Sequence, residues 1–573
     1  MKKLLKNIVF ISLASITFSS CLEETFPTDI ATSDQVSVSE EALGALSNSV
    51  IAYMTTYDGG TSDNTNFGYA GFMMWRDVML QDMPVYSTSY DYFNYGFGTT
   101  SYLGDYPVPS MFWTYHYNLI NNANLLIGSI DPETMTETTK SYLGNALVYR
   151  AMAYMDLSRY FEYKHTGVSS LDSKAEANGI YGLTVPLITE NTSEEEGRNN
   201  PRVPFYKMYR FIMNDLNNAE KYLSNFQREK KNWADLSVVY GMKARLWMEL
   251  GSRFELYPDD LATQISHDKD AELETYASLN INSASDCYAN AASYARKVID
   301  KGYTPVGEAQ WHDTASGFNT VNDAWIFAIL IGANDGLSSW KAFISQISPE
   351  QTFGTTQYGA YRMIGKSLFD KIPDADWRKT SWIAPDDAGK NPVPSQYKTL
   401  LSDEQWANIP AYTGFKFRPN QGNMGNYLIG NVVNIPLMRV EEMYFIEAEA
   451  VAHTQGVQTG ISLLENFMNT YRYKDGSYKC NSSNMELFID ELLVQKRIEF
   501  WGEGILAFDY KRLEKQIIRG YTGTNTPATH RYNSIKGYAA PWMNVYITSS
   551  EYKYNLSIIN NPDPSSSIEA WEE

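Results

Sequence analysis

A long helical pattern between Tyr142 and Tyr163 constrains the fold of this chain more than any other stretch. Arg150 falls on the apolar face of this predicted helix. Because burying an unpaired guanidinium is costly, we expect a buried carboxylate or carbonyl group to contact Arg150. The apolar or small side chains recur at i, i+3 and i+4, the spacing of one helix face; they are Leu143, Ala146, Leu147, Ala153, Tyr154, Leu157, Tyr160 and Phe161.

Two later segments, residues 239–247 and 439–450, have the same mixture of small residues and large aromatic side chains. Helices that cross closely need this mixture. We therefore predict an all-α fold with a core of helical hairpins stacked in tetratricopeptide fashion, with degenerate repeats because no strict 34-residue period is visible. One short apolar run, residues 323–330, is typical of a strand. Further helices are predicted near residues 37–53, 71–81, 110–127, 205–223, 289–300, 460–471 and 486–502.

Two long segments lack a helical period and are rich in aromatic residues. The first runs from Thr55 to Ser110 and the second from Gly332 to Arg362. Long aromatic loops inside a compact domain are usually functional or specially packed. No linker is clean enough to divide the chain, so we predict one helical domain, residues 37–573, with two large loop insertions.

The first residues have the layout of a bacterial export signal. Three lysines, Lys2, Lys3 and Lys6, precede an apolar region at Ile8–Phe18 that is too short to span a bilayer comfortably. Small residues stand immediately before Cys21. This layout favours a lipoprotein signal, residues 1–20, cleaved so that the thiol of Cys21 is acylated; an ordinary signal peptide with a nearby cysteine is the alternative. Residues 21–36 are then a lipid-anchored tether.

The residues that carry chemistry form no catalytic or metal-binding pattern. The formal net charge of −20 argues against a nucleic-acid partner, because phosphate binding depends on clustered Lys and Arg. The six His lack ligand-like spacing and no Cys-x-x-Cys occurs, so neither a metal nor another cofactor is predicted. Glu499 and Glu503 share a helix face and could mimic the acid/base pair of a glycosidase. We favour the alternative that they pair with Arg497 and Arg512 in a buried helix.

Five blocks of residues, in similar order and spacing from residue 21 to about residue 515, resemble the SusD/RagB family. Members of this family are surface lipoproteins that capture nutrients beside a TonB-dependent, SusC-like outer-membrane transporter. Two residues depart from the family pattern: Leu506 stands where Arg is usual, and Glu441 stands where Ala is common. Neither difference changes the predicted fold. The blocks are Cys21–Glu24 with Pro27; Trp113, Tyr117 and Ile120–Asn124; Tyr149–Ala151 with Tyr154, Leu157, Tyr160 and Val185–Leu187; Leu437–Ala450; and Lys496–Phe500 with Glu503, Gly504, Phe508, Asp509 and Arg512.

The resemblance implies an all-α core of four tetratricopeptide-like helix pairs with ligand-binding loops on one face. It also implies a non-enzymatic protein that binds a glycan, an oligo- or polysaccharide, and delivers it to the SusC-like transporter, which it covers as a lid. Glu23 and Glu24 resemble the acidic signal that sends lipoproteins to the cell surface in Bacteroidetes-type bacteria. The alternatives are a peptide-binding member of the family, a helical glycoside hydrolase and a purely structural tetratricopeptide scaffold.

The ligand contacts of the family correspond here to two segments, near residues 71–105 and 332–362. Sugar rings present C–H faces that stack on Trp and Tyr, while polar side chains bind the sugar oxygens. Loop packing is the alternative for each aromatic residue. Asp82 and Arg362 are weaker candidates, and Trp325 is expected in the core. We expect ligand contacts from Trp75, Tyr90, Tyr92, Asn94 and Tyr95 in the first segment and from Trp340, Tyr358 and Tyr361 in the second.

Overall fold

Helix α6, Glu137–Phe161, contains the long apolar pattern and packs mainly against α3, α5 and α9. Its first turn is closed by a capping box, in which the side chains of Thr136 and Thr139 accept hydrogen bonds from each other's backbone N–H groups. From Leu143 onward nearly every side chain is buried. The helix therefore lies inside the array and not on its surface.

Arg150 on α6 has the buried partners that the sequence pattern requires. Its guanidinium donates two hydrogen bonds of 2.8 Å to the carboxylate of Asp215, one of 2.8 Å to Asn124 and one of 2.6 Å to Glu190. These partners come from three other segments of the chain, so the charge that would be costly alone joins α5, α6 and α9.

The structure, a computed structural model, describes residues 39–56, 65–86, 88, 90–97, 100, 103–335 and 339–573. The predicted signal, Cys21, the tether and the predicted helix start at Ser37 lie outside these residues. The α-helices are α3 (Glu40–Ala52), α4 (Tyr69–Met79), α5 (Pro107–Ser129), α6 (Glu137–Phe161), α7 (Ser169–Ala177), α8 (Glu194–Gly197), α9 (Phe205–Tyr222), α10 (Leu236–Leu256), α11 (Pro258–His267), α12 (Ala284–Ile299), α13 (Glu308–Trp311), α14 (Phe343–Ile347), α15 (Lys366–Phe369), α16 (Asp403–Trp406), α17 (Tyr427–Gly430), α18 (Val440–Gln455), α19 (Val457–Tyr471), α20 (Met485–Glu499), α21 (Leu506–Arg512) and α22 (Ser549–Tyr552).

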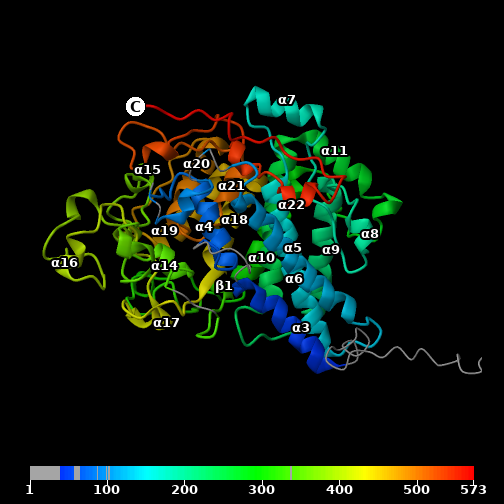
Figure 1. The fold of residues 1–573 in the computed structure, drawn as a ribbon, viewed down its shortest axis with the longest axis horizontal. Coiled ribbons are helices and arrows are strands. Elements are labelled where there is room, and N and C mark those ends of the chain that lie inside the picture. The colour runs from blue at the N-terminus through cyan, green and yellow to red at the C-terminus, as the bar shows by residue number, and fades with distance from the viewer. Residues whose placement is uncertain are drawn as a thin grey trace, which may run out of the picture.

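The long helices pack in chain order, as a stacked array requires. Helix α5 packs on α6, α6 on α9, α9 on α10, α10 on α12, α12 on α18 and α18 on α19. Figure 1 shows α3, α5, α6 and α9 on one side of the molecule and α14, α16 and α17 on the other. The all-α fold predicted from the sequence is confirmed. Within the described part of the chain, every helix is too short or too polar to cross a lipid bilayer.

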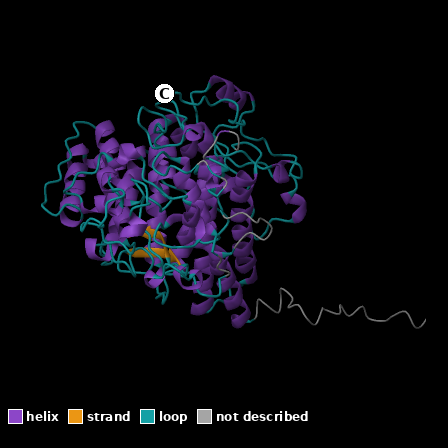
Figure 2. Cartoon of the chain, turned by 60° about the vertical axis from the view of Figure 1, so that its left-hand side comes forward, coloured by secondary structure: helices purple, strands orange, loops and turns teal. Residues whose placement is uncertain are grey.

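Two short strands form the only sheet of the described residues (Figure 2). Strand β1, Trp325–Ile329, confirms the predicted strand and pairs antiparallel with β2, Ile435–Arg439. Trp325 is fully buried, as expected for core. Strand β2 was not predicted, and Pro436 weakens its strand pattern. Residues 435–439 form a strand because they pair with β1, which lies more than 100 residues earlier in the chain.

The structure moves several predicted helix ends by a few residues. Helix α5 begins at Pro107 instead of Ser110, since proline is tolerated in the first turn. Asp235 caps α10 by accepting from the N–H groups of Ser237 and Val238. Between α12 and α18 the described residues form only short helices, the two strands and loops, and the predicted second loop segment, residues 332–362, is part of this region (Figure 1).

Candidate functional site

The two aromatic loop segments meet in a stack of three rings. The ring of Tyr358 lies nearly parallel to that of Tyr90, with centroids 4.2 Å apart and planes at 5°. The ring of Trp340 stacks on the same tyrosine at 5.0 Å and 22°. Tyr90 and Tyr358 are 45% and 46% exposed, and Trp340 is half-buried. We call Tyr90, Tyr358 and Trp340 the aromatic stack.

A buried ion pair holds the two loops together beside the stack. Arg362 and Asp91, both fully buried, form two hydrogen bonds between guanidinium and carboxylate, one of them 2.9 Å between Nη2 and Oδ1. The same carboxylate accepts from the backbone N–H groups of Tyr86 and Phe93 at 2.9 and 3.2 Å. Bidentate pairs between a guanidinium and a carboxylate fix geometry. Because Asp91 follows Tyr90 directly, the pair sets the position of the stack. We call the ion pair of Asp91 and Arg362 the clamp.

The remaining predicted contacts in these loops are half-buried and lie around this clamp. The rings of Tyr92 and Tyr95 meet edge to face at 6.2 Å. Asn94 Oδ1 accepts a hydrogen bond of 2.6 Å from Nε2 of His530. Burial lowers the pKa of this histidine to about 4, so the imidazole is neutral at pH 7. This contact could not be predicted from the sequence, because 436 residues separate its partners.

Tyr361 stands at the border between the stack and a second hydrophobic cluster. Its ring packs, partly buried, against that cluster, which includes Ile383, Tyr397 and Trp406. Burial raises the pKa of its phenol. The side chain therefore has both a packed face and a surface that is open beside the clamp.

Trp75 lies elsewhere, in the core. It sits in the middle of α4, a helix that is buried on every face, and is fully covered. Phe93 packs on its ring at 4.5 Å, and Gly96 approaches it so closely that a Cβ there would lie 2.7 Å from the indole. In this conformation Trp75 offers no surface to a ligand. Trp75 supports the first loop by packing against Phe93 and Gly96. We therefore leave it out of the candidate site.

The two weaker polar candidates are also occupied internally. The carboxylate of Asp82 accepts hydrogen bonds of 2.6 and 2.7 Å from Arg497, and Arg362 is the cation of the clamp. Both side chains are therefore structural partners of the loops, and neither points a free charge at a ligand.

Glu499 and Glu503 are buried members of an ion network and not an acid/base pair. Glu499 accepts from Arg472 at 2.7 Å and from Arg378 at 2.9 Å, and Glu503 accepts from Lys416 at 2.6 Å. Although burial acts to raise it, the pKa of Glu499 is held well below its usual range by Arg472 and Arg439. A general acid needs the opposite shift.

The preferred structural interpretation of these two glutamates is therefore correct, but the predicted partners were wrong. Arg497 pairs with Asp82, and Arg512 pairs with Glu449 and Asp509. Spacing along one helix identified residues that share a face, whereas the actual partners come from other segments of the chain.

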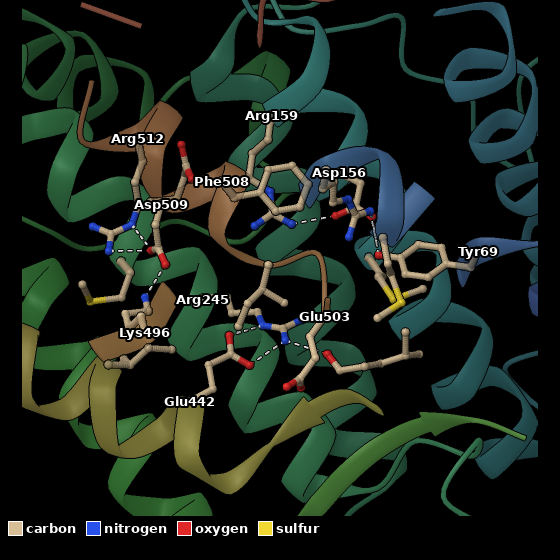
Figure 3. A pocket seen from close by; sticks show the side chains of 18 residues that line it. Tyr69, Asp156, Arg159, Arg245, Glu442, Lys496, Glu503, Phe508, Asp509 and Arg512 are labelled. Atoms are coloured by element: carbon tan, nitrogen blue, oxygen red, sulfur yellow. Dashed lines mark hydrogen bonds and ion pairs between the residues drawn. The ribbon is translucent and has the colours of Figure 1, made fainter. Parts of the chain in front are cut away.

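A small charged cavity between the helices extends this network (Figure 3). Arg245 donates hydrogen bonds of 2.7 and 2.6 Å to Glu442, and Arg512 pairs with Asp509 at 2.8 Å. The cavity measures about 50 Å³, far below the roughly 300–1,000 Å³ of ligand pockets. These charges thus connect α10, α18 and α21 and do not form a sugar site.

Comparisons with known proteins agree with this architecture. A family model described as starch-binding, associating with the outer membrane, matches residues 63–248, and one described as the SusD family matches residues 375–567. No match was found among curated proteins.

Solved structures resemble the whole chain at low identity. A SusD-like carbohydrate-binding protein from Bacteroides vulgatus ATCC 8482 is similar with a TM-score of 0.64 and 18% identity, covering 91% of this chain and 97% of that one. A SusD superfamily protein from Bacteroides thetaiotaomicron VPI-5482 gives 0.62 and 18%, covering 92% and 100%. A laminarin-binding SusD-like protein gives 0.60 and 15%, covering 91% and 99%. At such identities the similarity shows the shared fold.

Proposed function

The chain belongs to the SusD/RagB family, and we propose that it binds a glycan at the aromatic stack and delivers it to a SusC-like, TonB-dependent transporter. The family is one of carbohydrate-binding proteins that associate with the outer membrane. A member is a binding protein and not an enzyme. The ligand site, the anchor and the transporter are the parts that we propose for this chain.

The observation that carries the ligand site is the stack itself. Rings from two loops, 268 residues apart in the case of Tyr90 and Tyr358, lie nearly parallel while almost half of each side chain remains exposed. Flat aromatic surfaces of this kind match the C–H face of a sugar ring. Asn94 and the phenols of Tyr92, Tyr95 and Tyr361 lie on the same loops and are the polar groups that we propose to bind sugar hydroxyls.

Peptides also bind to tyrosine-rich surfaces, so a peptide ligand is the alternative within the family. We favour a sugar because a column of stacked rings offers flat apolar area without a deep side-chain pocket. An extended peptide would also need a row of free backbone groups to pair with.

The anchor and the transporter complete the proposal. Acylation of Cys21 would hold the protein at the outer membrane of a Bacteroidetes-type bacterium, and the acidic residues Glu23 and Glu24 favour the outer surface. We propose that the bound glycan is then enclosed between this protein, acting as a lid, and the transporter barrel. The resemblance to the family supports this step.

The test is a binding panel with the soluble protein, residues 22–573. Laminarin, starch, plant, microbial and host glycans are titrated alongside peptide digests, and each sample is analysed for cleavage products. Tyr358→Ala removes the central ring of the stack, and Tyr554→Ala, a change at a tyrosine that is 79% exposed and far along the chain, is the matched control. We expect saturable glycan binding without cleavage that Tyr358→Ala weakens and Tyr554→Ala does not.

Each other outcome has a defined meaning. Cleavage of any glycan would replace the binding function by hydrolysis. Binding of peptides alone would assign the chain to the peptide-binding branch of the family. Glycan binding that is unaffected by Tyr358→Ala would place the ligand away from the stack.

A further inference from the structure

A second aromatic pocket lies far from the stack, where the ends of four helices meet. The segment after α6, the starts of α9 and α11 and the end of α10 enclose a volume of about 300 Å³. Figure 1 shows α9 and α11 on the opposite side of the molecule from α14. Along the chain, α14 lies between the two stack residues Trp340 and Tyr358. The pocket is therefore separate from the stack.

Four half-exposed rings form the walls of this pocket. His165 stacks on Tyr181 with centroids 4.2 Å apart and planes at 24°, and lies 6.5 Å from Tyr257 at 27°. Tyr206 faces them from the start of α9 and is held from behind by His267, at 3.9 Å and 4°. Each ring is thus held in place by a neighbour. Such a wall offers flat apolar faces with phenol groups at the edges.

The ammonium group of Lys164 faces the same space. The side chain of Lys164 is 9% exposed, and within the described part of the chain its Nζ donates no hydrogen bond. The nearest carboxylate oxygen, Oε1 of Glu162, is 4.0 Å away, and the ring centroid of Tyr257 is 5.0 Å away. Glu162 is instead bonded by Arg253. The N–H groups of Lys164 can donate to an oxygen supplied by a ligand or by water.

The charges around the pocket favour a neutral ligand. Lys164 and Arg253 are matched by Glu162 and by Asp260, which contacts Arg253 Nη2 at 2.8 Å. A ligand carboxylate would face both of these acids, whereas a hydroxyl group can accept from Lys164 and donate to Glu162 at once. The volume is at the lower end of ligand pockets and has room for one or two sugar rings.

We propose that this pocket is a second carbohydrate site, which binds a neutral mono- or disaccharide through stacking on His165, Tyr181 and Tyr257 and a hydrogen bond from Lys164. The proposal does not depend on the function of the aromatic stack. Binding here would hold a terminal sugar unit on the side of the molecule opposite the stack.

The test is made in the background of Trp340→Ala/Tyr358→Ala, so that the stack cannot contribute. Saturation-transfer NMR measures binding of D-glucose, D-galactose, D-mannose and D-xylose, of maltose and laminaribiose, and of D-glucuronate and D-galacturonate. Lys164→Met removes the donor, and Tyr181→Ala removes a wall and serves if Lys164→Met does not fold. Lys231→Met is the matched control, because Lys231 also lies over a tyrosine ring, at 4.7 Å from that of Tyr303, but outside the pocket.

We expect at least one neutral sugar to bind in this background, more tightly than the uronates. Lys164→Met should weaken binding roughly tenfold, the effect of losing a hydrogen bond from a charged donor, and Lys231→Met should leave it unchanged. Tyr181→Ala should also weaken it. The proposal is refuted if no neutral sugar gives a saturable signal, if only uronates bind, or if neither pocket variant changes the affinity while both retain the parent melting temperature.

Discussion

Replacing Asp91 by Asn tests whether the clamp positions the aromatic stack. The substitution keeps the shape of the side chain but an acceptor for only one of the N–H groups of Tyr86 and Phe93, which bond different oxygens of Asp91. It also leaves the guanidinium of Arg362 buried without a counter-charge. Removing one partner of a buried ion pair costs about 3–5 kcal/mol. Both loops belong to irregular insertions, so we expect this cost to appear as local opening and not as global unfolding.

Hydrogen exchange measured by mass spectrometry reports this opening directly. A cost of about 3–5 kcal/mol corresponds to a rise of roughly 10²- to 10³-fold or more in the opening equilibrium. We expect faster exchange in peptides covering residues 84–97 and 355–365, together with weaker glycan binding. Asp370→Asn is the control, because Asp370 is an exposed acid paired with Lys366 on the surface, where such pairs contribute little.

The double variant Asp91→Asn/Arg362→Met completes the test. It removes the uncompensated charge, so the two segments should exchange more slowly than in Asp91→Asn alone. Unchanged exchange in Asp91→Asn, or a double variant that is less stable than the sum of both single changes, would refute the clamp.

Three further predictions concern the ligand, the anchor and pH. Trp340→Ala should lower glycan affinity by roughly 5- to 30-fold, the loss of about 1–2 kcal/mol of stacking, and should leave the melting temperature nearly unchanged. The control is Trp233→Ala, a change at a half-buried tryptophan elsewhere in the chain. A large shift in melting temperature with intact affinity would reassign Trp340 to packing. Cys21→Ser should release the protein from membranes upon fractionation, and continued attachment would contradict the lipoprotein prediction. Burial lowers the pKa of His530 from 6.5 to about 4, so the unfolded chain binds more protons between these values and stability falls as the pH drops from about 6.5 towards 4. Acidification from pH 7 to 5 should therefore cost wild type about 2 kcal/mol more than His530→Asn in chemical denaturation, and equal losses in both proteins would exclude the histidine as the source.

The helical core follows from information that lies within short stretches of the sequence. The 3.6-residue period of α6 is local, and so is the need of Arg150 for a buried partner, because both depend only on which side chains share one helix face. The aromatic loops were recognisable for the same reason, as long stretches without a period.

Exposure of a given ring, by contrast, is decided by segments far away in the chain. Trp75 and Tyr358 belong to similarly aromatic stretches, yet the first is buried and the second is 46% exposed. The sequence of α4 carried a signal, because a helix that is apolar on all sides is a buried one. The exposure of Tyr358 had no such signal, since it depends on contact with Tyr90 and Trp340.

The sequence by itself thus indicated the long helices, the two aromatic loop segments and the family. Only the tertiary structure decided that Asp91 meets Arg362, that β2 pairs with β1, and that Lys164 lines a pocket. The physical reason is the range of the interactions. Periodicity is set by neighbours along one helix, whereas burial, ion pairing and cavity formation depend on packing between segments that the chain brings together only when it folds.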